Sequence, residues 1–221
     1  METWGFDFYD ANLDVAGWIQ FIHHPASQRA AYASACIGPD RRLVVVVDPA
    51  IKIPVLKPSL EFRAEGIWAQ HVCETPLEHW SVGLEAFGVA LEDPLDALKA
   101  DPWGDRIGVG YDLEWESTET TLDLVHASGT GFGQDCRVTG ELLLADLQFD
   151  LDGAGRRWRA WGIDPLAILA ELSPSPLPDP ILTTPVRLDS PFGNATGGPQ
   201  QAMVLNRQLD LSTGWSLRLT V

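Results

Sequence analysis

Apolar and polar residues alternate with a period of two along most of this chain, and runs with a helical period are scarce. The clearest segment is 111–116, in which Tyr111, Leu113 and Trp115 alternate with acidic residues. Successive side chains of a β-strand point to opposite faces, so this pattern predicts a strand with one face in a core and the other in water. The same alternation marks residues 4–9, 18–23, 60–65, 136–142 and 215–221.

One strand and several turns have distinct signatures. The uninterrupted apolar run 43–47 predicts a strand buried on both faces. Gly38-Pro39-Asp40 and Ser212-Thr213-Gly214 are typical of turns. Thr75-Pro76-Leu77 predicts the turn of a β-hairpin, and so does Asp152-Gly153 between two apolar runs.

Helices are expected at only two places. Asp93-Pro94 starts a helix that runs to about residue 100, and Asp164-Pro165 starts another that runs through residue 172. In each, Asp caps the helix and proline occupies its first position. Residues 173–200 contain seven prolines and little periodicity, which predicts an irregular segment that either links strands or covers the mouth of a barrel.

The fold class predicted by these elements is all-β. Around a dozen short strands with two short helices favour a β-barrel or a barrel-like sandwich. A length of 221 residues fits one such domain or two small ones. We expect an N-terminal β-module over residues 1–100 and a C-terminal β-module over residues 101–221, packed as one compact barrel-like unit.

Composition and charge exclude several functions. The net charge of −16 and the isoelectric point near 4.5 argue against binding to nucleic acid or to anionic membranes. No apolar run is long enough to insert in a membrane, and no secretory signal is visible, so a cytoplasmic protein is expected. Cys36, Cys73 and Cys136 are odd in number and widely spaced, which predicts reduced core residues.

Residues 67–91 place acid–base groups beside aromatic residues. Glu74 and Glu78 flank the predicted hairpin turn, and His71 and His79 lie on its two strands. In an apolar cavity the pKa of a glutamate rises, so either carboxyl could act as a general acid near neutral pH, with a histidine as proton relay. The alternative is that both carboxylates lie at a rim and both imidazoles are hydrogen-bonded structural groups.

Other side chains could line or serve the same pocket. Tyr111 could donate a proton or orient a ligand oxygen, although structural burial is the alternative. The chain contains nine tryptophans, which predict either core packing or aromatic pocket walls. Arg157 or Arg159 could hold a carbonyl or carboxylate of the substrate. The tryptophans expected to contact the substrate are Trp18, Trp68, Trp80, Trp158 and Trp161.

No strong catalytic or cofactor motif is present. The chain contains no P-loop, no GxGxxG after a strand, no HExxH and no GxSxG. On a strand, only His71 and Cys73 of the group around residue 74 share a face, which is too few ligands for zinc. We therefore expect no metal and no cofactor.

Several segments nevertheless resemble a known family. TWGFDFYDANLDVAGWIQFIHHP (3–25), LEFRAEGIWAQHVCETPLEHWSVGLEAFGVALEDP (60–94) and GDRIGVGYDLEWE (104–116) are similar to the bacterial carotenoid 1,2-hydratase-like proteins, also called hydroxyneurosporene-synthase-like or AttH-like. The resemblance covers residues 3–163. It implies a lipocalin-like (calycin) fold, built as a pair of β-barrels or half-barrels.

One segment departs from that family. Residues 136–162 align with a stretch that usually ends in Arg-Asp-His-Ser-Trp-Gly, and Arg157, Trp161 and Gly162 keep this pattern. Trp158 stands where the family has Asp, and Arg159 stands where it has His. The resemblance therefore implies either that another acid is used or that the reaction differs, for example a cyclisation that depends on folding a polyene.

These observations favour a cofactor-independent enzyme that acts on a large apolar intermediate such as an isoprenoid, polyene or polyketide. The reaction would add to, or cyclise across, carbon–carbon double bonds, as a hydratase (lyase) or as a cyclase or isomerase, including a pericyclic one. The alternatives are a non-catalytic carrier of a hydrophobic small molecule and a β-domain with a filled core. An enzyme predicts a buried Glu, His or Tyr that points into the cavity. Free edge strands would favour a homodimer.

Overall fold

The computed structural model describes residues 1–52, 59–99, 101–165, 167–168, 182–189, 202–210 and 214–220. Eleven strands form one antiparallel sheet: β1 (Glu2–Asp10), β2 (Val15–His24), β3 (Arg29–Ile37), β4 (Leu43–Lys52), β5 (Ser59–Ala64), β6 (Ile67–Thr75), β7 (His79–Leu91), β8 (Asp105–Ser117), β9 (Leu122–His126), β10 (Gly129–Leu144) and β11 (Leu147–Gly162). A second sheet contains β12 (Leu182–Asp189), β13 (Ala202–Asp210) and β14 (Gly214–Thr220). Two 3-10 turns, η1 (Pro25–Ser27) and η2 (Pro94–Leu98), complete the described elements.

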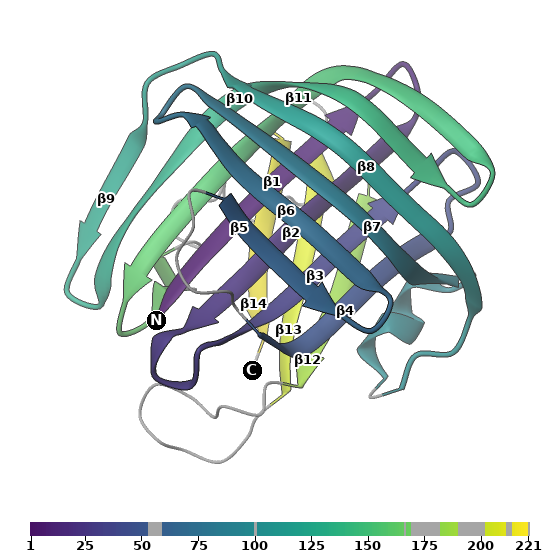
Figure 1. Cartoon of the computed structure of the whole chain (residues 1–221), viewed down its shortest axis with the longest axis horizontal. Helices are drawn as coiled ribbons and strands as arrows, with labels where there is room; N and C mark the ends of the chain where they lie inside the picture. Colours follow the sequence, from purple (N-terminus) through teal and green to yellow (C-terminus); the bar gives the residue numbers. More distant parts are fainter. Residues whose placement is uncertain are drawn as a thin grey trace.

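The large sheet closes into a barrel (Figure 1). The ring runs β1-β2-β3-β4-β7-β8-β10-β11 and returns to β1, which pairs with β11 along eight residues. β4 pairs with β7 only over residues 43–45, and the β5–β6 hairpin lies between them beyond that point. The predicted all-β, barrel-like fold is thus confirmed. Strands from both sides of residue 100 belong to this one ring.

The strand alternation sorts side chains between the barrel interior and its surface. On β8, Tyr111, Leu113 and Trp115 are buried in the interior, whereas Asp112 and Glu116 are exposed. The same rule directs alternate residues of the neighbouring strands inward, and together they line the interior with aromatic and aliphatic side chains. Burial of this apolar surface is the main force that stabilises the closed ring.

The small sheet covers part of the outer surface of the barrel. β12 contacts β3 and β4, and β14 contacts β1 and β11, as Figure 1 shows behind the barrel. The Trp18 indole N–H donates to Thr184 Oγ1 at 2.8 Å across this contact. Because β4 lies between the interior and this cover, residues 43–46 are buried on both faces, as predicted, whereas Val47, the last residue of the predicted run, is exposed.

The Asp152-Gly153 turn prediction is wrong. This pair lies in the middle of β11, and the β10–β11 turn is at residues 145–146, where Ala145 has a φ of 56°. The glycines at this level permit close approach of β1 instead. A Cβ at Gly153 would lie 2.2 Å from the Tyr9 carbonyl oxygen, and one at Gly155 would lie 1.9 Å from that of Asp7.

The two predicted helix starts have different outcomes. The first begins at Asp93, whose carboxylate accepts the Leu95 N–H at 2.9 Å, but it is the short 3-10 turn η2. At the second, Asp164 Oδ1 accepts the Ala167 N–H at 3.1 Å, which is the predicted cap. Residues 165 and 167–168 are helical, and the later part of that predicted helix lies outside the described residues. Most of the segment 173–200, with its predicted crossing or covering role, also lies outside them, and within that segment only β12 is described.

Gly140 on β10 is the glycine whose replacement should most clearly disturb the barrel. Its φ is +130°, and an added Cβ would lie 2.1 Å from the Asp112 carbonyl oxygen of β8. Backbone strain and overpacking are expected to lower the free energy of unfolding of Gly140→Ala by about 2 kcal/mol. Urea denaturation measures this loss. Gly108→Ala is the control, because a Cβ there meets no atom within 4 Å, and an equal loss in both variants would contradict the explanation.

Candidate functional site

His71 lies at the centre of the barrel interior. The alternation of β6 directs it inward, and its side chain is completely buried. Four aromatic rings surround the imidazole, with centroid distances of 5.4 Å to Phe6, 5.3 Å to Phe21, 5.5 Å to Phe62 and 6.1 Å to Tyr32. The site is therefore an imidazole enclosed by aromatic side chains.

Neither ring nitrogen of His71 has a hydrogen-bond partner among the described residues. Burial lowers the pKa of this imidazole from 6.5 to about 3, because the charged form loses its hydration. At neutral pH one ring nitrogen of His71 is therefore a donor and the other an acceptor. Each buried polar group without a partner lowers the free energy of unfolding by about 1–3 kcal/mol. The alternative role of a hydrogen-bonded structural imidazole therefore does not fit His71 in the described part of the chain.

Other polar groups face the same interior. The hydroxyls of Tyr32 and Tyr111 lie 3.3 Å apart, and Tyr111 donates to Ser34 Oγ at 3.3 Å. Burial raises the pKa of both tyrosines, so their hydroxyls stay protonated at neutral pH. The Trp80 indole N–H is buried and has no partner among the described residues. The interior thus offers neutral donors and acceptors.

One end of the barrel, where β1 begins and β11 ends, carries arginines stacked on aromatic rings; we name it the arginine end. The Arg159 guanidinium lies 4.3 Å from the Trp4 ring centroid and 5.1 Å from that of Trp161. It donates to Glu2 Oε1 at 2.7 Å, and both side chains are partly exposed. Arg159 therefore has a carboxylate partner at the rim.

Arg157 lies deeper at the arginine end and is only 4% exposed. Its guanidinium is 5.1 Å from the Phe132 ring centroid and 5.9 Å from that of Trp80. Arg157 Nε and Nη2 both donate to Gln134 Oε1, at 2.9 and 2.6 Å. Gln134 was not among the predicted residues. The available signal was its polarity at an inward position of an otherwise apolar strand face, 132–138.

Both predicted acids and one of the two predicted relays, His79, lie outside the barrel, whereas the other relay, His71, lies inside it. Glu74 is exposed and accepts the Ser81 hydroxyl at 2.8 Å, and Glu78 is exposed in the hairpin turn. His79 Nε2 lies 2.5 Å from Glu114 Oε2 on the outer surface. Because His71 and Trp80 point inward, their neighbours along the strands point outward. The apolar surroundings predicted for these two glutamates are therefore absent, and neither they nor His79 meet His71.

The five tryptophans predicted to contact the substrate lie in different parts of the barrel. Trp80 alone of the five lies in the interior, and Trp161 is 40% exposed at the arginine end. Trp18 and Trp158 are buried on the outer face of the barrel, where Trp158 Nε1 donates to Asp7 Oδ2 at 2.9 Å. These two are packing residues, and their expected role as interior pocket walls is not supported.

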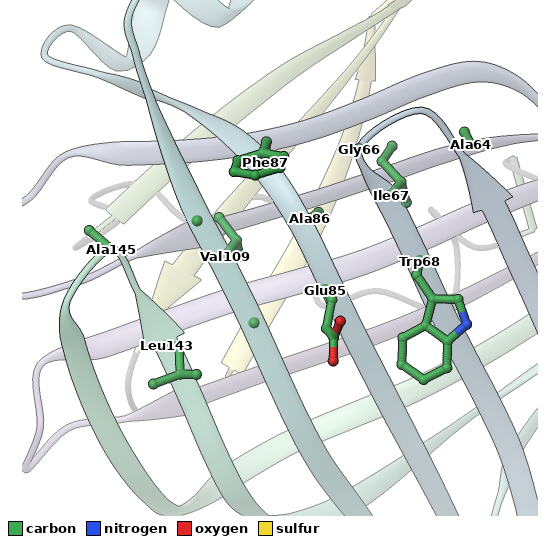
Figure 2. Close-up of a pocket in the computed structure, with 12 residues that line it drawn as sticks. Ala64, Gly66, Ile67, Trp68, Glu85, Ala86, Phe87, Val109, Leu143 and Ala145 are labelled. Atoms are coloured by element: carbon green, nitrogen blue, oxygen red, sulfur yellow. The ribbon is translucent and has the colours of Figure 1, made fainter.

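Trp68 lines an open hollow on the outer surface, of about 610 Å³. Figure 2 shows Trp68, Glu85 and Leu143 projecting on the same side of β6, β7 and β10. Gly108 and Gly110 of β8 also line the hollow, and because they have no side chains they leave space between the neighbouring strands β7 and β10. Glu85, the one titratable side chain in this lining, is exposed, unlike the buried His71.

Two further observations concern metal binding and helix length in the described part of the chain. Within it, no group of three His, Cys, Asp or Glu side chains is arranged to hold a metal ion. None of its helices has the length and apolar character needed to cross a membrane.

The three cysteines are free thiols, and Cys36 and Cys136 are buried as predicted while Cys73 is half-buried.

Comparison with known proteins gives a family and no function. No curated protein matches the chain. A family described as a domain of unknown function, DUF7064, matches residues 1–164, which include every strand of the barrel. This match covers well over half of the sequence, and the chain therefore belongs to the DUF7064 family.

Proposed function

We propose that this protein binds a predominantly apolar small molecule inside the barrel, in the manner of a carrier. The observation that carries the proposal is His71, a fully buried imidazole whose two ring nitrogens have no partner among the described residues and which lies among aromatic rings. Buried polar groups in proteins are nearly always hydrogen-bonded, and exceptions need a reason. A ligand that supplies one acceptor and one donor, or either alone, would provide that reason.

The aromatic surroundings fit the rest of such a ligand. The Phe6 ring centroid lies 5.4 Å from that of His71 and 5.7 Å from that of Trp80. His71 and Trp80, whose ring nitrogens have no partner among the described residues, therefore both pack against the Phe6 ring. Ligand sites are usually apolar with a few convergent polar groups, and these side chains match that description. At the arginine end, Trp4 and Cys73 are partly buried and pack on the interior cluster, so we propose that the ligand enters there.

Ligand binding is expected to depend on His71. We would screen polyenes, terpenoids and linear polyketide mimics by quenching of tryptophan fluorescence, and follow the His71 ring nitrogens by NMR after labelling histidine with nitrogen-15. A ligand that hydrogen-bonds His71 should shift its nitrogen signals. His71→Leu should weaken binding of that ligand at least about tenfold, the equivalent of one lost hydrogen bond.

His79→Leu is the matched control, because His79 lies on the adjacent strand but faces outward. It should leave the affinity unchanged. The proposal fails if every compound that binds does so equally well to the wild type and to His71→Leu, or if no compound in the panel binds.

A second candidate function is an isomerase or cyclase. It is favoured by the neutral imidazole together with the protonated Tyr32 and Tyr111 hydroxyls in one apolar interior, since neutral donors can polarise a carbonyl while the walls hold a flexible chain. Hydration is less favoured, because protonation of a double bond needs a stronger acid and Glu74 and Glu78 face outward.

Mass spectrometry of each bound compound separates these functions. A carrier returns the compound unchanged. An isomerase or cyclase returns the same mass at a different retention time, and a hydratase adds the mass of one water. The specific substrate classes named from the sequence remain predictions.

A further inference from the structure

The strongest unexplained charge in the described residues is Arg157. It is the one buried lysine or arginine among them, and no carboxylate of the described part of the chain lies within 4.0 Å of its guanidinium nitrogens. The chain carries 31 acidic residues against 15 basic ones, so acidic side chains are plentiful. A buried cation without a counter-charge is costly, and burial lowers the pKa of Arg157 accordingly.

Neighbouring arginines on the same strand have carboxylate partners. Arg156 points outward and pairs with Asp135, and Arg159 pairs with Glu2 at 2.7 Å. Arg157 instead has the neutral Gln134 amide oxygen, which takes one N–H from Nε and one from Nη2. Of the five N–H groups of a guanidinium, three therefore remain without a protein acceptor among the described residues.

Gln134 holds this guanidinium in place. Its NH₂ group donates to Leu77 O at 2.9 Å, Ser117 Oγ at 2.6 Å and Glu119 O at 3.0 Å, which directs the amide oxygen toward Arg157. Those three acceptors belong to the β6–β7 turn, the end of β8 and the segment that follows it. The free N–H groups of Arg157 are thus positioned by a hydrogen-bonded framework rather than by an ion pair.

We propose that Arg157 binds the carboxylate of an amphipathic ligand whose apolar part enters the barrel toward His71. The inference rests on the proposed function and adds the ligand class, an apolar carboxylic acid. A planar carboxylate matches the guanidinium fork and replaces the missing counter-charge. Cζ of Arg157 lies 5.9 Å from the Trp80 ring centroid, and the Phe6 ring contacts both Trp80 and His71. This row of side chains connects the arginine end to the centre of the barrel.

A matched pair of probes tests the inference. The fluorescent polyene cis-parinaric acid and its methyl ester share one tail and differ in charge. The wild-type protein should bind the acid about 10–100-fold more tightly than the ester, as expected for a charge-assisted hydrogen bond. Arg157→Gln should bind the two probes equally, and Arg157→Lys should keep part of the preference because it retains the charge but not the fork.

Arg159→Gln is the control on the same strand face, and it should keep the full preference because Arg159 is already paired with Glu2. Near-ultraviolet circular dichroism verifies that each variant is folded. Equal affinity of wild-type protein for acid and ester would overturn the role of Arg157 and leave the binding function intact. The role also fails if folded Arg157→Gln prefers the acid as strongly as the wild type, or loses both probes alike. If neither probe binds the wild type, the inference fails, and a hit from the wider screen would show that the binding function survives it.

Discussion

Lowering the pH from 7 to 4 is expected to reduce the free energy of unfolding by about 3 kcal/mol through His71 alone. The pKa of this imidazole is about 3 in the folded protein, against 6.5 for an unperturbed histidine. Below pH 6.5 the unfolded chain therefore binds a proton that the folded chain does not. The stability contributed by the neutral imidazole is complete above pH 6.5 and is lost as the pH falls toward 3, at about 1.4 kcal/mol per pH unit.

The variant His71→Leu isolates this effect, because leucine is close to imidazole in volume and does not titrate. At pH 7 the variant is expected to be more stable by about 1–3 kcal/mol, since the unpartnered nitrogens are removed. The difference in free energy of unfolding between variant and wild type should increase steadily as the pH falls below 6.5. Urea unfolding at several pH values measures it.

The other histidines do not affect the difference in stability between His71→Leu and the wild type. Partial burial also lowers the pKa of His23 and His24, but their contribution is the same in both proteins and cancels in the difference. A gap that stays constant between pH 7 and pH 4 would mean that His71 is hydrated or hydrogen-bonded in solution. The nitrogens of His71 would then be satisfied without a ligand, and the proposed binding site would lose its main support.

Replacement of Trp115 by alanine is expected to lower the free energy of unfolding by about 3–5 kcal/mol. The Trp115 side chain is fully buried in the barrel interior and packs on Phe6 and Phe8, with ring centroids 5.3 and 6.3 Å away. Its indole N–H donates to the Asp7 carbonyl oxygen at 3.0 Å, so truncation also leaves an acceptor of β1 with one bond fewer. The loss combines a cavity, lost aromatic contacts and a lost hydrogen bond.

Thermal unfolding of Trp115→Ala, compared with Trp103→Ala, measures this. Trp103 is 86% exposed, so its replacement should change the stability by less than about 0.5 kcal/mol. A loss below about 1 kcal/mol for Trp115→Ala would contradict close packing of Trp115 against Phe6 and Phe8.

Much of the fold was predictable because it depends on local pattern. The alternation at 111–116, the turn at 75–77 and the run at 43–47, apart from the exposed Val47, all correspond to structure, since strands and tight turns depend on local residue patterns. The Asp152-Gly153 error has the same origin. Glycine permits both a turn and the close approach of another strand, and its sequence neighbours do not distinguish them.

The sequence by itself determined that Glu74 and His79 would face away from Cys73 and Trp80, because neighbours on a strand point to opposite sides. Which of the two sides became the interior was decided only by the tertiary structure, through the closure of β11 onto β1 and the register of β6 against β7. The same closure buried His71 without a hydrogen-bond partner, and Arg157 without a counter-charge, in the part of the chain that the structure describes. Hydrogen-bond partners and counter-charges come from strands distant in the chain, so only the folded barrel reveals that they are missing.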